Sequence, residues 1–202
     1  MARPSKNKHT DLKQIFPRDK EFFGNIKNCG VVTTQHLKDA GITKSRMKEY
    51  IKCGYMQKTK PENGGKFGYV ATPRGKDFAE KTWGYERKDF YTFQSLEHCG
   101  KLAEEYFQTD HSRYEWRTES QAREMFQDKI EQIREEDPGR AEKIEQLWEK
   151  GDISMPDALV IERGTERILA VEVITNSYGQ QELQQKELFV EIMQVEYKPI
   201  RA

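Results

Sequence analysis

Two acidic side chains in the second half of the chain, Asp157 and Glu172, are the clearest candidates for chemistry. Each lies in an apolar stretch, residues 155–161 and 167–173, and a short turn containing Gly164 separates the stretches. A two-residue type II′ hairpin loop with this glycine at its first central position would set the strand register. In that register Asp157 lies directly opposite Glu172, and opposed Cβ atoms are about 4.5–5.5 Å apart.

Two carboxylates at this separation repel each other unless another group offsets their charges. Three groups can do so: a divalent cation, a shared proton or a basic neighbour. A purely structural arrangement is the fourth alternative, because both side chains stand at strand ends, where solvent screens them. The spacing of the two acids leaves these four alternatives open.

The segments that position the acids alternate between helical and extended patterns. Residues 82–94 are rich in aromatic side chains and are expected to pack as a connector. An apolar stripe predicts a helix over residues 95–107, and residues 114–119 are typical of a short strand. A long charged stretch from Ser120 predicts two amphipathic helices, broken at Pro138, that suit either core packing or a dimer contact.

The order Pro156-Asp157, hairpin, Glu172-Val173-Ile174 resembles the Pro-Asp…(Asp/Glu)-x-Lys nuclease core. The resemblance implies a mixed sheet flanked by helices over residues 83–202. In active members the acids hold Mg²⁺, and the lysine positions or activates the attacking water. It also implies a further acidic ligand on the preceding helix, where Glu104 or Glu105 is placed to serve.

This sequence departs from the pattern at the lysine, because Ile174 stands in its place. Lys186, on a helix expected from about residue 180 to 191, is a candidate replacement. The resemblance then implies Asp157, Glu172 and Lys186 as the catalytic set and Asp157, Glu172 and Glu104 as the Mg²⁺ ligands. Either the lysine has moved, or the fold persists without cleavage activity, and the missing lysine favours the second interpretation.

Charge divides the chain into two unlike parts although its net charge is zero. Residues 1–90 carry 20 basic and 10 acidic side chains, whereas the remainder carries 14 basic and 24 acidic ones. A basic part of this kind favours a polyanionic partner. The acidic part suggests a protein partner. Residues 1–18, basic and interrupted by two prolines, are expected to form a flexible arm.

Residues 19–82 resemble a winged helix-turn-helix domain. Two short helices are predicted at 35–40 and 44–52, followed by strands at 55–58 and 67–71 around a glycine-containing turn. The likeness is carried by the segment 34–43, the basic helix after it and the glycine-tipped hairpin. The overall expectation is therefore an α+β protein, with this domain preceding the mixed-sheet, nuclease-like domain.

A winged helix implies binding to double-stranded DNA, because an α-helix fits the major groove and flanking cations contact phosphates. The candidate contacts share a basic or hydroxyl side chain on the second of these helices or beside the hairpin. They are Lys44, Ser45, Arg46, Lys48, Lys52, Lys58, Lys60 and Lys66.

Both halves together are similar to the replication-relaxation family of plasmids and integrative elements. The motifs are a helix with His98 and Leu102, then residues 116–119, 156–159 and 170–172. The likeness implies a DNA-binding accessory protein in plasmid replication, DNA processing or mobilisation. The alternatives are a Mg²⁺-dependent endonuclease targeted by the winged helix and a homodimeric transcription regulator.

Two further expectations concern the cellular setting. No apolar run approaches the ~20 residues that span a bilayer, and the N-terminus lacks an apolar signal segment, so we expect no membrane partner and a cytoplasmic location. An odd number of cysteines, Cys29, Cys53 and Cys99, is not a disulfide framework. We expect all three to be reduced and buried.

Overall fold

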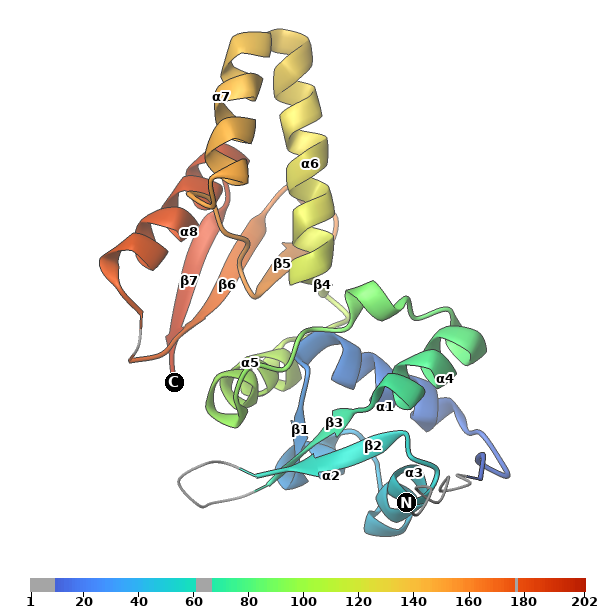
Figure 1. The fold of residues 1–202 in the computed structure, drawn as a ribbon. Helices are drawn as coiled ribbons and strands as arrows, with labels where there is room; N and C mark the ends of the chain where they lie inside the picture. The colour runs from blue at the N-terminus through green and yellow to red at the C-terminus, as the bar shows by residue number, and fades with distance from the viewer. Residues whose placement is uncertain (1–9, 61–66, 177) are drawn as a thin grey trace, which may run out of the picture.

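The computed structural model describes residues 10–60, 67–176 and 178–202. It is an α+β structure with two separate sheets, one of three strands and one of four (Figure 1). The predicted class is therefore confirmed. None of the helices in the described ranges is long and apolar enough to cross a membrane.

The N-terminal part contains four helices around the three-stranded sheet. Its elements are α1 (Pro17–Cys29), β1 (Val32–Thr33), α2 (Thr34–Asp39), α3 (Lys44–Lys52), β2 (Met56–Thr59), β3 (Gly68–Ala71) and α4 (Pro73–Trp83). The strands are antiparallel in the order β1-β3-β2. Helix α3 has the predicted bounds, and the Thr43 side chain caps it by accepting the Arg46 amide at 3.1 Å.

Aromatic side chains fill the core of this part. Phe22 and Tyr50 stack with ring centroids 5.3 Å apart, and both are fully buried. The start of α4 packs so closely on the chain that a Cβ at Gly75 would lie 2.0 Å from the Tyr55 carbonyl oxygen. Glycine is therefore required there, and it joins α4 to α3 and β2.

The C-terminal part contains the four-stranded sheet. Its elements are η1 (Arg87–Asp89), α5 (Leu96–Gln108), β4 (Tyr114–Thr118), α6 (Glu119–Glu136), α7 (Pro138–Glu149), β5 (Ala158–Glu162), β6 (Ile168–Ile174), α8 (Gln180–Met193) and β7 (Glu196–Arg201). Strands β4, β5 and β6 are antiparallel neighbours, and α8 carries the chain to β7, which pairs parallel with β6.

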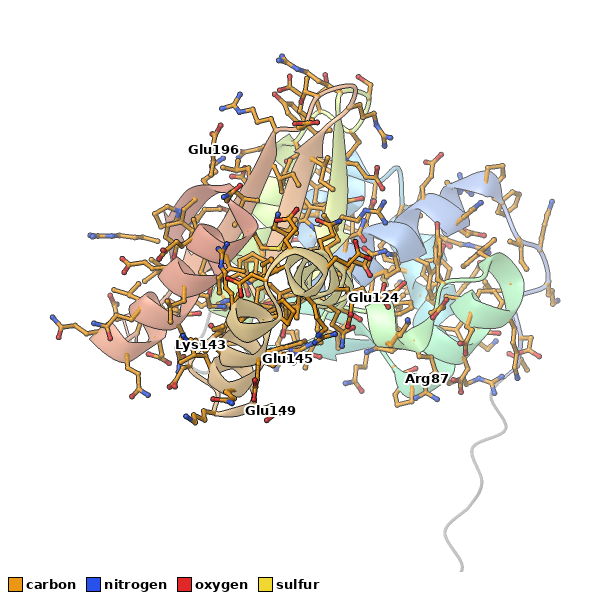
Figure 2. All side chains as sticks on the ribbon, turned by 90° about the horizontal axis from the view of Figure 1, so that it is seen from above. Arg87, Glu124, Lys143, Glu145, Glu149 and Glu196 are labelled. Carbon is orange, nitrogen blue, oxygen red and sulfur yellow. The ribbon has the colours of Figure 1, made fainter. Side chains whose placement is uncertain are left out.

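Helices cover both faces of this sheet because its strand residues alternate. Val160 and Val171 pack with Leu102 of α5, whereas Leu159 and Ala170 pack in a cluster with side chains from α6, α7 and α8. The α6–α7 hairpin projects beyond the sheet (Figure 1). Figure 2, which looks down on the hairpin, shows Lys143, Glu145 and Glu149 around it and Glu196 at the edge of the sheet.

The β5–β6 hairpin has the predicted register, since Ala158 pairs with Val171 and Ile161 with Ile168. The predicted turn type is wrong. The Thr165 amide donates to the Glu162 carbonyl at 3.3 Å, so Gly164, with φ 77°, is the second central residue of the turn and not the first. A positive φ at that position still requires glycine, and the register is unchanged.

The two parts share an apolar interface built on α5. This helix packs on α1 and on β6, and one buried cluster includes Cys29 and Val31 from the first part with Leu102 and Val171 from the second. A division of the chain after residue 82 therefore cuts through shared packing. All three cysteines are buried and free, as predicted.

The predicted flexible arm is wrong for the stretch that the structure describes. Asp11 accepts hydrogen bonds from the Tyr55 hydroxyl and from Arg74 Nη2, both at 2.7 Å. Helix α1 already begins at Pro17, which suits the first helical position. Residues 10–18 thus belong to the N-terminal part, and the rest of the arm, residues 1–9, lies outside the described residues.

Candidate functional site

The strands β5 and β6 bring Asp157 and Glu172 together as predicted. The Asp157 amide donates to Glu172 Oε2 at 3.0 Å, and the Val173 amide donates to Asp157 Oδ2 at 2.7 Å. The two side chains are 5% and 0% exposed, so solvent does not screen them. The interpretation of two solvent-screened strand ends is therefore wrong.

Two basic side chains offset the carboxylates. Lys186 Nζ lies 2.9 Å from Glu172 Oε1 and also donates to the Met155 carbonyl. His98 Nε2 of α5 lies 3.1 Å from Asp157 Oδ2. Of the four arrangements open to the sequence, the structure shows the one with basic neighbours.

Two tyrosines complete the set. Tyr91 donates its hydroxyl hydrogen to Asp157 Oδ1, and Tyr178 donates to Glu172 Oε1 at 2.5 Å. All four carboxylate oxygens accept at least one protein hydrogen bond. We call this set the acid cluster: Tyr91, His98, Asp157, Glu172, Tyr178 and Lys186.

The charges in the acid cluster follow from burial and pairing. Burial raises the pKa of Asp157, but His98 and Tyr91 more than offset this, and the pKa is lowered. Burial and the Asp157 charge together raise the pKa of Glu172. Burial lowers the pKa of His98, but the contact with Asp157 outweighs it and raises the pKa to about 10. The imidazolium is therefore the stable form at neutral pH.

A cavity of about 360 Å³ opens beside the acid cluster. Asp157, Tyr178 and Lys186 line it on one side. Glu119 and Trp148 line it from α6 and α7. The acid cluster therefore has one side that a small ligand or a phosphodiester can reach.

Helix α5 does not supply the predicted third acid. Glu104, the predicted metal ligand, is half exposed and pairs with Lys101 at 2.8 Å. Glu105 pairs with Lys198 of β7 at 2.5 Å. The residue of α5 that meets Asp157 is His98, nearer the start of the helix, so the Glu104 assignment is wrong.

The acid cluster as folded does not fit Mg²⁺. This ion takes oxygen ligands at about 2.0–2.1 Å in near-octahedral geometry and keeps several waters. Asp157 and Glu172 instead spend their oxygens on protein donors, with a cation against each. Within the described ranges, no three His, Cys, Asp or Glu side chains are arranged to hold a metal ion.

The predicted DNA contacts lie mostly on one exposed face. Lys44, Ser45, Lys48 and Lys52 are exposed on α3, and Lys58 and Lys60 are exposed on and just after β2. Lys66 lies outside the described residues.

Arg46 is a correction to that set, because its side chain is only 6% exposed. It donates to both carboxylate oxygens of Asp19, which is fully buried. The Tyr50 hydroxyl donates to the same carboxylate at 2.5 Å. Arg46 therefore holds α3 against α1, and it is not available to phosphates.

The sequence reasoning missed three members of the acid cluster. His98 entered only through a family likeness, Tyr91 was expected to pack in an aromatic connector, and Tyr178 was not singled out. A hydroxyl and an imidazole in the apolar stripe around Cys99 and Leu102 were the available signal, since buried polar groups need partners.

No protein-family model, curated protein or solved structure matches this chain. The functional argument therefore rests on the geometry of the chain itself.

Proposed function

We propose that this protein binds duplex DNA through a winged helix formed by residues 10–83, with α3 and β2 as the contact surface. The C-terminal part is a nuclease-like domain whose acid cluster is neutralised internally. Such a protein suits an accessory role in the replication, processing or mobilisation of a plasmid or other mobile element. The element order helix–helix–strand–strand in residues 34–71 supports the first assignment.

One observation carries the DNA proposal: a face of lysines without acidic partners. Within the described residues, Lys44, Lys48, Lys58 and Lys60 have no carboxylate within ion-pair distance. By contrast, arginines in the C-terminal part pair with glutamates, as Arg167 does with Glu196 at 2.7 Å. Unpaired cations on a helix and its neighbouring strand attract phosphates and release counterions from DNA.

The order of strands supports the nuclease-like assignment. A hairpin, β5–β6, carries both acids, and α8 crosses to the parallel strand β7 and delivers Lys186 to Glu172. Two carboxylates and two cations sum to no net charge when His98 is protonated. An acid pair balanced in this way supports a scaffold role, since a metal would have to displace protein donors.

The test is a binding and cleavage assay on duplex DNA with Mg²⁺, with Mn²⁺ and with chelator. The double variant Lys44→Ala/Lys48→Ala is expected to lose about tenfold in affinity. Its matched control, Lys143→Ala/Lys150→Ala on α7, removes the same charge and is expected to bind normally. Equal binding by the two double variants would exclude α3 as the contact surface.

A Mg²⁺-dependent endonuclease is the second candidate, favoured by the contact of Lys186 with Glu172 at the edge of the cavity. The same assay separates the two candidates. Metal-dependent cuts that disappear in Asp157→Asn would establish the nuclease and a rearrangement of the acid cluster on binding. Salt-sensitive binding without any cut supports the accessory role.

A further inference from the structure

A groove of about 830 Å³ runs between the two short helices and the hairpin strands of the N-terminal part. We call it the lysine-rimmed groove. It is lined by α2, the α2–α3 turn, α3, β2 and β3. Its volume is in the range of pockets that bury a ligand or side chains from a partner.

The rim of this groove carries one sign of charge. Lys38 of α2, Lys44 and Lys48 of α3, and Lys58 of β2 all line it. No acidic side chain is among its described lining residues. Lys58 lies 4.7 Å from the centre of the Phe67 ring, which keeps its ammonium at the rim. The complementary ligand is therefore acidic at its edges.

The floor of the groove is apolar. Leu37, Ile42, Met47 and Met56 form it, with the partly buried Ile51 at the side. A phosphodiester backbone satisfies the lysines but offers little apolar surface to this floor. A ligand that matches both features has apolar side chains along one stripe and carboxylates on either side of it.

We propose that the lysine-rimmed groove is the docking site for an acidic amphipathic helix of a protein partner. Helices seat in such grooves by apolar anchors at i, i+3 or i+4, and i+7. Their flanking glutamates or aspartates would pair with Lys38, Lys44 and Lys48. Two of these lysines also belong to the DNA surface, so the partner and DNA bind in competition.

A second copy of the chain does not supply this ligand. The α6–α7 hairpin is rich in acidic residues, but its apolar stripe is turned into the core. Among the described residues, Ile15 is the single exposed large hydrophobic side chain. One such residue does not fill a groove of this size, and an external helix is the better match.

The test uses a fluorescein-labelled synthetic helix of about 20 residues, with leucines at i, i+4 and i+7 and glutamates flanking them. Fluorescence anisotropy is expected to give micromolar binding to the wild-type chain. Lys38→Glu and Ile51→Ser are expected to weaken it at least tenfold, and duplex DNA to displace the peptide. Thermal melting verifies that both variants are folded, and Lys38, an exposed side chain, is the safer of the two.

Two controls separate docking from charge attraction. Lys60→Ala removes a cation outside the groove and is expected to leave peptide binding unchanged. A peptide with serines in place of the leucines is expected not to bind. The proposal is overturned if wild-type protein binds DNA but not the peptide, or if the serine peptide binds equally well. It is also overturned if Ile51→Ser weakens DNA binding alone, which would assign the groove to DNA.

Discussion

The protein contains two buried ionic clusters, one in each part, and they differ in how many like charges they hold. In the N-terminal part a single carboxylate, Asp19, is matched by Arg46 and Tyr50. In the C-terminal part the carboxylates of Asp157 and Glu172 adjoin. The first arrangement balances by one contact between helices, whereas the second requires two cations drawn from different helices.

This difference separates a packing contact from a candidate site. Asp19 also accepts the Phe16 amide at 2.8 Å, so its pairing ties the start of α1 to α3 and completes a helix terminus. The acid cluster instead holds like charges together beside a cavity, which costs stability without an evident structural return. Groups held at such a cost are candidates for function.

The largest expected effect is on the N-terminal pair. Arg46→Met leaves the Asp19 carboxylate buried without its cation and is expected to lower the free energy of unfolding by about 3–5 kcal/mol. Urea denaturation measures this change. The double variant Asp19→Leu/Arg46→Met removes both charges and is expected to recover part of the loss. A loss below about 1 kcal/mol in the single variant would contradict the structural role.

A smaller effect is expected in the acid cluster. Lys186→Met removes the cation beside Glu172, but Tyr178 and the Asp157 amide still donate to that carboxylate. We expect a loss of about 1.5–3 kcal/mol in the free energy of unfolding. Glu187→Gln, an exposed neighbour on α8, serves as the control and is expected to be neutral. A gain in stability would mean that Lys186 is held there for function alone.

Acid unfolding distinguishes the N-terminal pair from surface carboxylates. Burial raises the pKa of Asp19, but the bonds from Arg46 and Tyr50 outweigh it and lower the pKa. Its stabilising contribution is therefore present above the unfolded value of 3.8 and is lost as pH falls through the lower folded value.

We expect Asp19→Asn to flatten the fall of the melting temperature with acid, because the variant has no carboxylate at this position to protonate. Asp110→Asn is the comparison: the pKa of Asp110 is also lowered, by bonds from Ser112, but the group is fully exposed. Its curve should follow the wild type. An Asp19→Asn curve that also follows the wild type would show that this pair does not govern acid unfolding.

The smallest effects are expected at the surface. Lys44→Ala and Lys48→Ala should each weaken DNA binding a few-fold and reduce the salt slope by about one. Anisotropy titrations at several salt concentrations measure both. Stability should be unchanged within about 0.5 kcal/mol, in contrast with Arg46→Met on the same helix. A slope that does not change in either variant would remove these lysines from the phosphate contacts.

Local patterns were sufficient for most of the secondary structure. The apolar stripe and Thr43 located α3, and Pro138 located the break between α6 and α7. The hairpin register followed from alternation and loop length, which placed Asp157 against Glu172 although the turn type was wrong. These features depend on neighbours a few residues apart, so their signals are contained in short segments.

The partners of the charged groups depend on distant segments and could not be obtained in this way. Arg46 looks like its basic neighbours on α3, but Asp19, 27 positions earlier, holds it inside. His98 meets Asp157 because α5 packs on one face of the sheet, and Lys186 meets Glu172 because α8 crosses to β7. Which residues of a helix meet a buried charge is set by how whole elements pack, because Coulombic and desolvation energies depend on final distances and burial.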